Sequence, residues 1–157
     1  MSVAAVRLDD RLIHGQVIVG WANTLDLERL VVVDDTLREN EWEQDIYRIG
    51  IPDELEVVFT SVEEARAQIA SWASDNRKTM LITGEVGTLL RLCHESVLIH
   101  DVNVGGVHRA EGRSERLPYV FLTDSEYEQL RELQNWSINV TAQDLPSTNP
   151  VALEALR

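Results

Sequence analysis

The amino-acid sequence predicts a single-domain α/β fold, with a mostly parallel, open twisted sheet and helices on both of its faces. Short runs rich in Val, Ile and Leu alternate along the chain with segments whose apolar residues recur at helical spacing. Such alternation is typical of parallel sheets whose crossover helices cover both faces. The 157 residues suffice for one hydrophobic core, and no linker, repeat or low-complexity segment divides them, so we expect one domain over residues 1–157.

Six apolar runs are predicted to be strands, because each is short and bounded by polar residues. In chain order they are Val3–Leu8, Arg29–Val33, Glu56–Phe59, Thr79–Ile82, Val97–Val104 and Ser137–Ala142. A polar, glycine-containing loop after Val104 interrupts the alternation. Beyond that loop, Tyr119–Leu122 is predicted to be one antiparallel strand.

Five segments between these strands carry apolar stripes at helical spacing. They are Ile18–Leu25, Trp42–Ile49, Val62–Trp72, Val86–Cys93 and Tyr127–Leu133. Ser61 followed by Glu64, and Thr123 followed by Glu126, each predict a capping box at a helix start. The tryptophans that lie on the stripes, Trp42 and Trp72, are expected in the core.

The formal net charge of −13 at pH 7 is the unusual bulk property. An acidic surface repels both the phosphate backbone of nucleic acids and anionic lipid, so neither is an expected partner. The apolar stretch at the N-terminus is too short for a signal peptide, and no segment approaches the roughly 20 apolar residues of a membrane span. We therefore expect a cytoplasmic protein without direct membrane insertion.

The cysteine and three of the four histidines are interpreted as structural residues. Cys93 lies on an apolar helical face and is expected to be buried. His94 is placed at a helix end, His100 within a strand and His108 in a loop after a strand. They have no recognised ligand spacing, so no metal site is expected. Only His108 is expected to approach the carboxyl edge of the sheet, where open α/β sheets bind ligands.

The strongest local signal is the segment RLDDRLIHGQ, residues 7–16, which joins the first strand to the first helix at that edge. A histidine beside a helix N-terminus lies where free amides favour an anion, so His14 is a candidate phosphoryl acceptor. Arg11 offers planar donors to phosphate oxygens, and Asp9 or Asp10 can fix the tautomer of the ring. Gly15 lets a bulky group on the imidazole approach the backbone.

Local chemistry alone also allows a purely structural interpretation of this segment. In that case His14 is a helix-entry residue, and Asp10 and Arg11 form a surface ion pair. Phosphoryl transfer needs mainly placement and charge stabilisation, so a small, shallow site suffices for the functional alternative.

Asp34 and Asp35 follow a strand and suggest a rival chemistry, an aspartyl phosphate with magnesium as in receiver domains. That chemistry requires a lysine after a later strand, whereas the sole lysine, Lys78, precedes one. Asp35 is therefore expected only to support the site. Gly105 and Gly106 are too few for a dinucleotide-binding fingerprint, so we expect no nucleotide cofactor. Nor do we expect a metal ion or any other organic cofactor.

The segment RLDDRLIHGQV, residues 7–17, resembles the signature near the N-terminus of IIB components in the mannose/fructose/sorbose class of bacterial phosphotransferase systems. The blocks ERLVVVDD (28–35), NVGG (103–106), EGR (111–113) and DLPSTNPVAL (144–153) are similar to further family segments. The resemblance thus extends nearly from end to end. It implies the fold that the periodicity predicts, together with a C-terminal strand and tail.

The resemblance implies that His14 is phosphorylated on Nδ1 and that the chain acts as a protein-phosphohistidine–sugar phosphotransferase. A IIA protein would be the phosphoryl donor, and the membrane components IIC and IID would lie on the acceptor side. The donor interface is expected to be a modest patch around His14 with a basic rim from Arg7, Arg11 and Arg109. The remaining expected site residues are Arg11 as oxygen clamp, Asp10 as orienter of the ring, and Gly15, Gln16, Asp35, Gly105 and Gly106 as supporting or phosphate-binding residues.

Residues 107–117 (VHRAEGRSERL) are more charged than the family pattern leads us to expect. This departure, and the absence of a transport segment from the sequence, motivate an alternative: a phosphorylatable regulatory module of an incomplete phosphotransferase system that controls a partner protein. The sugar and the oligomeric state stay open, an isologous homodimer included.

Overall fold

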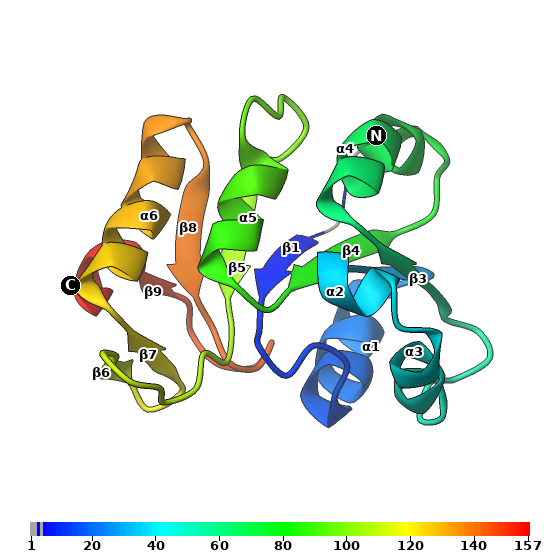
Figure 1. Cartoon of the computed structure of the whole chain (residues 1–157), viewed down its shortest axis with the longest axis horizontal. Coiled ribbons are helices and arrows are strands. Elements are labelled where there is room, and N and C mark those ends of the chain that lie inside the picture. The colour runs from blue at the N-terminus through cyan, green and yellow to red at the C-terminus, as the bar shows by residue number, and fades with distance from the viewer. Residues whose placement is uncertain (1–2, 4) are drawn as a thin grey trace.

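The computed structural model describes residues 3 and 5–157. Its main sheet has seven strands in the order β3-β2-β4-β1-β5-β8-β9 (Figure 1). The pairings are parallel except that of β8 with β9, which is antiparallel. The strands are β1 Ala5–Leu8, β2 Arg29–Val33, β3 Glu56–Thr60, β4 Thr79–Thr83, β5 Asp101–Val104, β8 Asn139–Ala142 and β9 Val151–Ala152.

Helices cover both faces of this sheet (Figure 1). Helices α4, α5 and α6 pack on one face, and η1, α1 and α3 lie on the other. The helices are η1 Gln16–Ala22, α1 Asn23–Leu25, α2 Asp35–Arg38, α3 Glu41–Arg48, α4 Val62–Ser74, α5 Val86–Cys93, α6 Asp124–Asn135 and η2 Leu153–Leu156.

The alternation of side chains along the strands divides the core into two layers. In β2, Val31 and Val33 belong to the cluster beneath α4, α5 and α6, whereas Leu30 and Val32 face η1. All four are buried, as expected of a central strand between two helical layers. The predicted α/β architecture is therefore confirmed.

The observed strands differ from the predicted ones mainly at their amino ends. Of the predicted strand Val3–Leu8, residue 4 lies outside the described residues, and β1 begins at Ala5. The run Val97–Val104 becomes a strand only at Asp101, because its first four residues bend or have no regular structure after the turn that ends α5. The placement of His100 within a strand is therefore wrong, and the residue is exposed.

The predicted antiparallel strand at Tyr119–Leu122 is confirmed as β7, Val120–Leu122, but it lies outside the main sheet. It pairs with β6, Ser114–Leu117, in a separate two-stranded sheet. The prediction missed β6 because two of its four residues are exposed and polar, so no apolar run marks it.

The prediction that Trp42 lies in the core is wrong, because α3 turns its apolar stripe outward. Trp42 is 74% exposed, whereas Gln44 on the inner side is buried. The Gln44 amide donates to the carbonyl oxygens of Leu37 and Arg38, at 2.8 and 3.0 Å. These two carbonyls close α2, so a polar side chain was needed on the side of α3 that faces it.

Both predicted capping boxes are confirmed. Ser61 and Glu64 exchange side-chain and backbone hydrogen bonds at the start of α4, as do Thr123 and Glu126 at the start of α6. The first helix was predicted as α-helical over Ile18–Leu25, but η1 is a π-helix that continues into α1. Such wide turns are rare and often lie at functional sites.

Candidate functional site

The loop between β1 and η1 is held at the carboxyl edge of the sheet by its neighbours. The Asp9 amide donates to Thr83 of β4 at 2.9 Å, and the Asp10 amide donates to Gly106 after β5 at 2.8 Å. The Leu12 amide closes a turn on the Asp9 carbonyl at 3.0 Å, with Leu12 itself in the left-handed region at φ 55°. This turn folds the chain back, so that His14 meets Asp9 five residues earlier.

The two ring nitrogens of His14 have different partners. Nε2 lies 3.1 Å from the carboxylate oxygen Oδ2 of Asp9, and Nδ1 accepts from the amide of Gln16 at 3.3 Å. A carboxylate partner requires the proton on Nε2, which leaves a lone pair on Nδ1. The side chain is 17% exposed, so solvent or a partner can reach part of it.

The carboxylate of Asp9 is fully buried and has hydrogen bonds to three side chains, those of Arg7, Arg11 and His14. Arg11 contacts both carboxylate oxygens, at 3.1 and 3.0 Å, and Arg7 contacts Oδ2 at 3.3 Å. Burial alone would raise the pKa of Asp9, but the hydrogen bonds from His14 and Arg11 outweigh it and hold that pKa far below its ordinary value. The carboxylate therefore stays ionised and can stabilise positive charge on the imidazole.

Arg7 is a buried cation beneath the site. Its guanidinium donates to the side chain of Asn103 and to the carbonyl oxygens of Gln143 and Asp144, at 2.9 and 3.0 Å for the two carbonyls. It also lies 4.8 Å from the centre of the Trp21 ring. Arg7 thus ties the C-terminal loop after β8 to Asp9. Because Arg7 is fully buried, the prediction that it belongs to a basic rim of the donor interface is wrong.

Gly105 and Gly106 make room for the two arginines rather than for a cofactor. A Cβ on Gly105 would lie 2.2 Å from Nη2 of Arg7, and a Cβ on Gly106 would lie 2.9 Å from Nε and Nη2 of Arg11. Any larger side chain would therefore displace a guanidinium group. This contact explains the paired glycines of the NVGG segment in physical terms.

The structure corrects the role expected of Asp10. Its carboxylate accepts from the backbone amide of His108 at 2.7 Å and contacts the His108 ring, so it faces the charged loop and not His14. Asp9 occupies the position that orients the His14 ring. The expected approach of His108 to the loop at the carboxyl edge is confirmed by the same contacts.

Asp35 is also corrected. Its carboxylate accepts from the Val62 amide at 2.8 Å and from Arg91 at 3.0 Å, which turns it toward α4 and α5. No hydrogen bond of the described residues joins it to His14 or Arg11. Its role is structural, because it fixes the start of α4.

Gly15 and Gln16 lie where the loop enters η1. The Gln16 side chain accepts from Arg11 at 2.8 Å, while its amide contacts His14 Nδ1, so Gln16 links both groups. Gly15 faces open space, with no other atom within 4 Å of an added Cβ. A groove of about 420 Å³, lined by His14, Gly15 and residues of η1 and α3, opens at this point.

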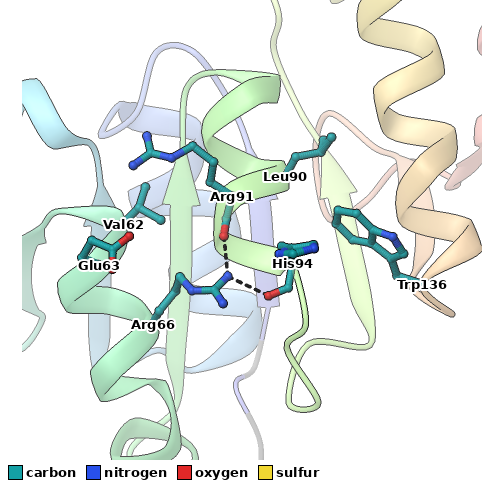
Figure 2. A pocket seen from close by; sticks show the side chains of 7 residues that line it. All are labelled: Val62, Glu63, Arg66, Leu90, Arg91, His94 and Trp136. Carbon is teal, nitrogen blue, oxygen red and sulfur yellow. Dashed lines mark hydrogen bonds between the residues drawn. The ribbon is translucent and has the colours of Figure 1, made fainter.

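A second groove, of about 460 Å³, lies on the opposite face of the sheet (Figure 2). Arg66 of α4 donates across it to the carbonyl oxygens of Arg91 and His94, at 2.6 and 2.7 Å, and thereby caps α5. The His94 ring packs edge-on against Trp136, with ring centres 5.2 Å apart. His94 ends α5 as predicted. Arg66 and His94 are therefore engaged in contacts within the fold, with the end of α5 and with Trp136.

Cys93 is buried as predicted. Burial raises the pKa of its thiol to about 12, so the reactive thiolate is scarce at neutral pH. Over residues 3 and 5–157, no group of three or more His, Cys, Asp or Glu side chains could hold a metal ion. The described helices include none that is long and apolar enough to cross a membrane.

Sequence reasoning placed Arg7 on the surface rim, missed its role as a buried partner of Asp9, and chose the wrong one of two adjacent aspartates. A signal for Arg7 was present: it alternates with Val6 and Leu8 in a central strand, where a charged residue is rarely buried without a partner. No local signal distinguishes Asp9 from Asp10, because the turn at Leu12 decides which carboxylate faces the ring.

Comparisons with known proteins show which family and which solved folds this chain is similar to. The family model described as "PTS system sorbose subfamily IIB component" matches residues 3–156. The N-acetylgalactosamine-specific phosphotransferase enzyme IIB component 1 of Escherichia coli is 31% identical over 148 residues, covering 92% of each chain. The sorbose-specific EIIB component of Klebsiella pneumoniae is 26% identical and covers 95% of this chain and 93% of its own. The crystal structure of manxB from Thermoanaerobacter tengcongensis superimposes with a TM-score of 0.89 at 28% identity, over 99% of this chain and 94% of that one.

Proposed function

Because this chain belongs to the sorbose subfamily of phosphotransferase-system IIB components, we propose that it relays a phosphoryl group on His14 during the uptake of a sugar. A IIA protein supplies the group, and the membrane components IIC and IID present the sugar that receives it. The chain works on the cytoplasmic side of the membrane. The observation that carries the proposal is the His14 ring, whose Nε2 is held by Asp9 and whose Nδ1 keeps its lone pair.

Transfer onto His14 is a displacement at phosphorus. The Nδ1 lone pair leaves the Gln16 amide and attacks the phosphorus of a phosphohistidine on the donor, and the new N–P bond forms as the donor's N–P bond breaks. The donor imidazole leaves with its electron pair. His14 keeps the proton on Nε2, so its ring becomes positive, and the Asp9 carboxylate 3.1 Å away stabilises that charge.

Arg11 supplies positive charge beside the incoming group. Its Nε and Nη2 donate to Asp9 and Gln16, whereas Nη1 makes no hydrogen bond to the part of the chain that the structure describes. Nη1 can therefore contact a phosphate oxygen while the pair with Asp9 stays intact. The side chain is 29% exposed, so a transferred phosphoryl group can reach it.

The second transfer removes the phosphoryl group from the same nitrogen and passes it to the sugar. A sugar hydroxyl oxygen attacks phosphorus, the bond to Nδ1 breaks, and the lone pair returns to His14. The hydroxyl proton leaves to a base of the membrane component that holds the sugar. Asp9 keeps the ring in one tautomer through both steps, so His14 needs no rearrangement between them.

The regulatory alternative shares the first step and differs only in the acceptor. It was suggested by the charge of residues 107–117. In the structure that loop is anchored through the His108–Asp10 contact and through Arg113, which pairs with Glu126 at 2.9 Å. Among residues 3 and 5–157, no specific contact favours the regulatory alternative over sugar transport.

The phosphorylated residue can be identified by labelling. We expect the wild-type chain and the Cys93→Ala variant to take up acid-labile, base-stable phosphate from a phosphorylated IIA donor, and His14→Ala to take up none. The readout is label per folded chain. Persistent label on His14→Ala would overturn the assignment, and loss of label with Cys93→Ala would move it to the thiol.

The role of Asp9 can be tested against that of its neighbour. We expect Asp9→Asn to slow the initial rate of labelling by about a hundredfold or more, because the ring loses its partner and its tautomer. Asp10→Asn is the matched control and should label at close to the wild-type rate, since Asp10 faces His108. Circular dichroism is the measurement that checks whether both variants fold. A slow Asp10→Asn beside a normal Asp9→Asn contradicts the mechanism.

A further inference from the structure

Helix α3 turns an apolar stripe away from the core. Trp42, Ile46 and Ile49 are 74%, 49% and 84% exposed, and their spacing of four and three residues places them on one side of the helix. An amphipathic helix normally buries its apolar stripe. This stripe contacts solvent instead, although α3 is otherwise held against the core by Gln44 and by Tyr47, whose ring centre lies 6.4 Å from that of Phe59.

The stripe continues toward the phosphoryl acceptor. Val19 of η1 is 65% exposed, and the groove beside His14 is lined by Val19, Ile46 and His14 itself. We call Val19, Trp42, Ile46 and Ile49 the α3–η1 patch. Over the described residues these are four of the five exposed large hydrophobic side chains. The fifth, Val97, lies before β5, at the amino ends of the parallel strands. Clustering of this kind marks an interaction surface.

The border of the patch is acidic on the α3 side. Residues 39–54 contain six acidic residues and one basic residue, Arg48. Glu41 and Asp45 on α3 are exposed, while η1 carries no charged residue. A partner that fits this surface therefore has an apolar centre and a basic border, because complementary charge speeds encounter and excludes wrong partners.

We infer that the α3–η1 patch docks the cytoplasmic face of the membrane component that presents the sugar. This inference rests on the proposed function. Cytoplasmic loops of membrane proteins carry an excess of Lys and Arg, which complements the acidic border. The chain's net charge of −13 is repelled by anionic lipid, so attachment to the membrane has to come from protein contacts.

The position of the patch fits this task. A phosphoryl group on Nδ1 reaches the sugar only when docking places His14 against the membrane component, and two residues of the patch, Val19 and Ile46, line the groove beside His14. Trp42 provides the large, rigid side chain that commonly dominates the binding energy of an interface. The patch therefore acts in the second transfer, from His14 to sugar.

The test compares the two transfers in Ile49→Asp and Trp42→Ala. The first readout is the rate of labelling of His14 by a soluble IIA donor. The second is sugar phosphorylation by membrane vesicles that carry IIC and IID from the same system, measured against the concentration of the chain. Val97→Asp is the matched control, because Val97 is 81% exposed and precedes β5, whereas the loop that holds His14 is bound to the residues that follow β5.

We expect both patch variants to label normally and to raise the KM for the chain in sugar phosphorylation by about tenfold or more. Added salt should raise the wild-type KM as well, and Val97→Asp should change nothing. Three results would overturn the inference: unchanged sugar phosphorylation, slower labelling by IIA with normal sugar phosphorylation, or a wild-type dimer that Ile49→Asp converts to a monomer. Failure of the wild type to label at all would refute the proposed function itself.

Discussion

At the scale of single residues, Asp9 fixes the geometry of the site. Its two oxygens form hydrogen bonds with Arg7, Arg11 and His14. One buried carboxylate therefore orients the nucleophilic ring and both guanidinium groups. A buried carboxylate of this kind is tolerated only because each partner also has further hydrogen bonds. Removing the Asp9 carboxylate would leave the fully buried Arg7 without its charged partner, although Asn103 and the loop after β8 would still accept from its guanidinium.

The spacing between Gly105 and Arg7 gives a residue-scale prediction. We expect Gly105→Ala to lower the free energy of unfolding by about 1–3 kcal/mol, because its Cβ would overlap a guanidinium that cannot move without losing its partners. Gly87→Ala is the control: Gly87 lies in α5 with open space around it, so helix propensity should stabilise the chain by about 0.5–1 kcal/mol. Urea unfolding measures both. A neutral Gly105→Ala contradicts the packing described.

At the scale of elements, helix starts and strand periods could be predicted from the sequence, whereas the orientation of α3 could not. Capping boxes depend on residues three apart, so Ser61 and Thr123 reveal them directly. The outward stripe of α3 depends on Gln44 reaching the end of α2, which is a tertiary contact. Periodicity identifies an apolar side of a helix but not the partner that covers it, inside the chain or outside it.

The capping box of α4 gives an element-scale prediction. Ser61→Ala should lower the free energy of unfolding by about 1 kcal/mol, because the Glu64 amide loses its acceptor at the helix start. Ser147→Ala, in an exposed loop, should stay within about 0.5 kcal/mol of the wild type. Thermal or urea denaturation of the two variants is the measurement. Equal stability of the two would show that the cap contributes nothing.

At the scale of the whole molecule, the parallel sheet brings distant segments to one edge. The loops after β1, β5 and β8 supply His14, Gly105–Gly106 and the carbonyl oxygens that bind Arg7. The sequence predicted this edge and the loop that holds His14, because strand–helix alternation implies a parallel sheet whose strands all end at one edge. It could not predict which of Asp9 and Asp10 meets the ring, since that depends on a left-handed residue at Leu12.

The charge network around Asp9 predicts how the stability of the fold depends on pH. Asp9 has its pKa lowered in the folded chain by hydrogen bonds from His14 and Arg11, which outweigh its burial, so it binds a proton less readily than in the unfolded chain. Its contribution to stability is complete above the ordinary carboxylate pKa of about 4 and is lost as the pH falls below that value. We expect the free energy of unfolding, measured in urea, to drop between about pH 4 and pH 2. The decline should be shallower in Asp9→Asn. A flat profile in the wild type would contradict the ionised, paired Asp9.

Nitrogen NMR of the His14 ring tests the central claim most directly. In chain labelled with ¹⁵N on histidine, the couplings of the ring nitrogens should show the proton on Nε2 before phosphorylation and phosphate on Nδ1 after it, with Nε2 still protonated. A phosphate on Nε2, or a resting ring protonated on Nδ1 alone, would contradict the assignment of Asp9 and the proposed mechanism.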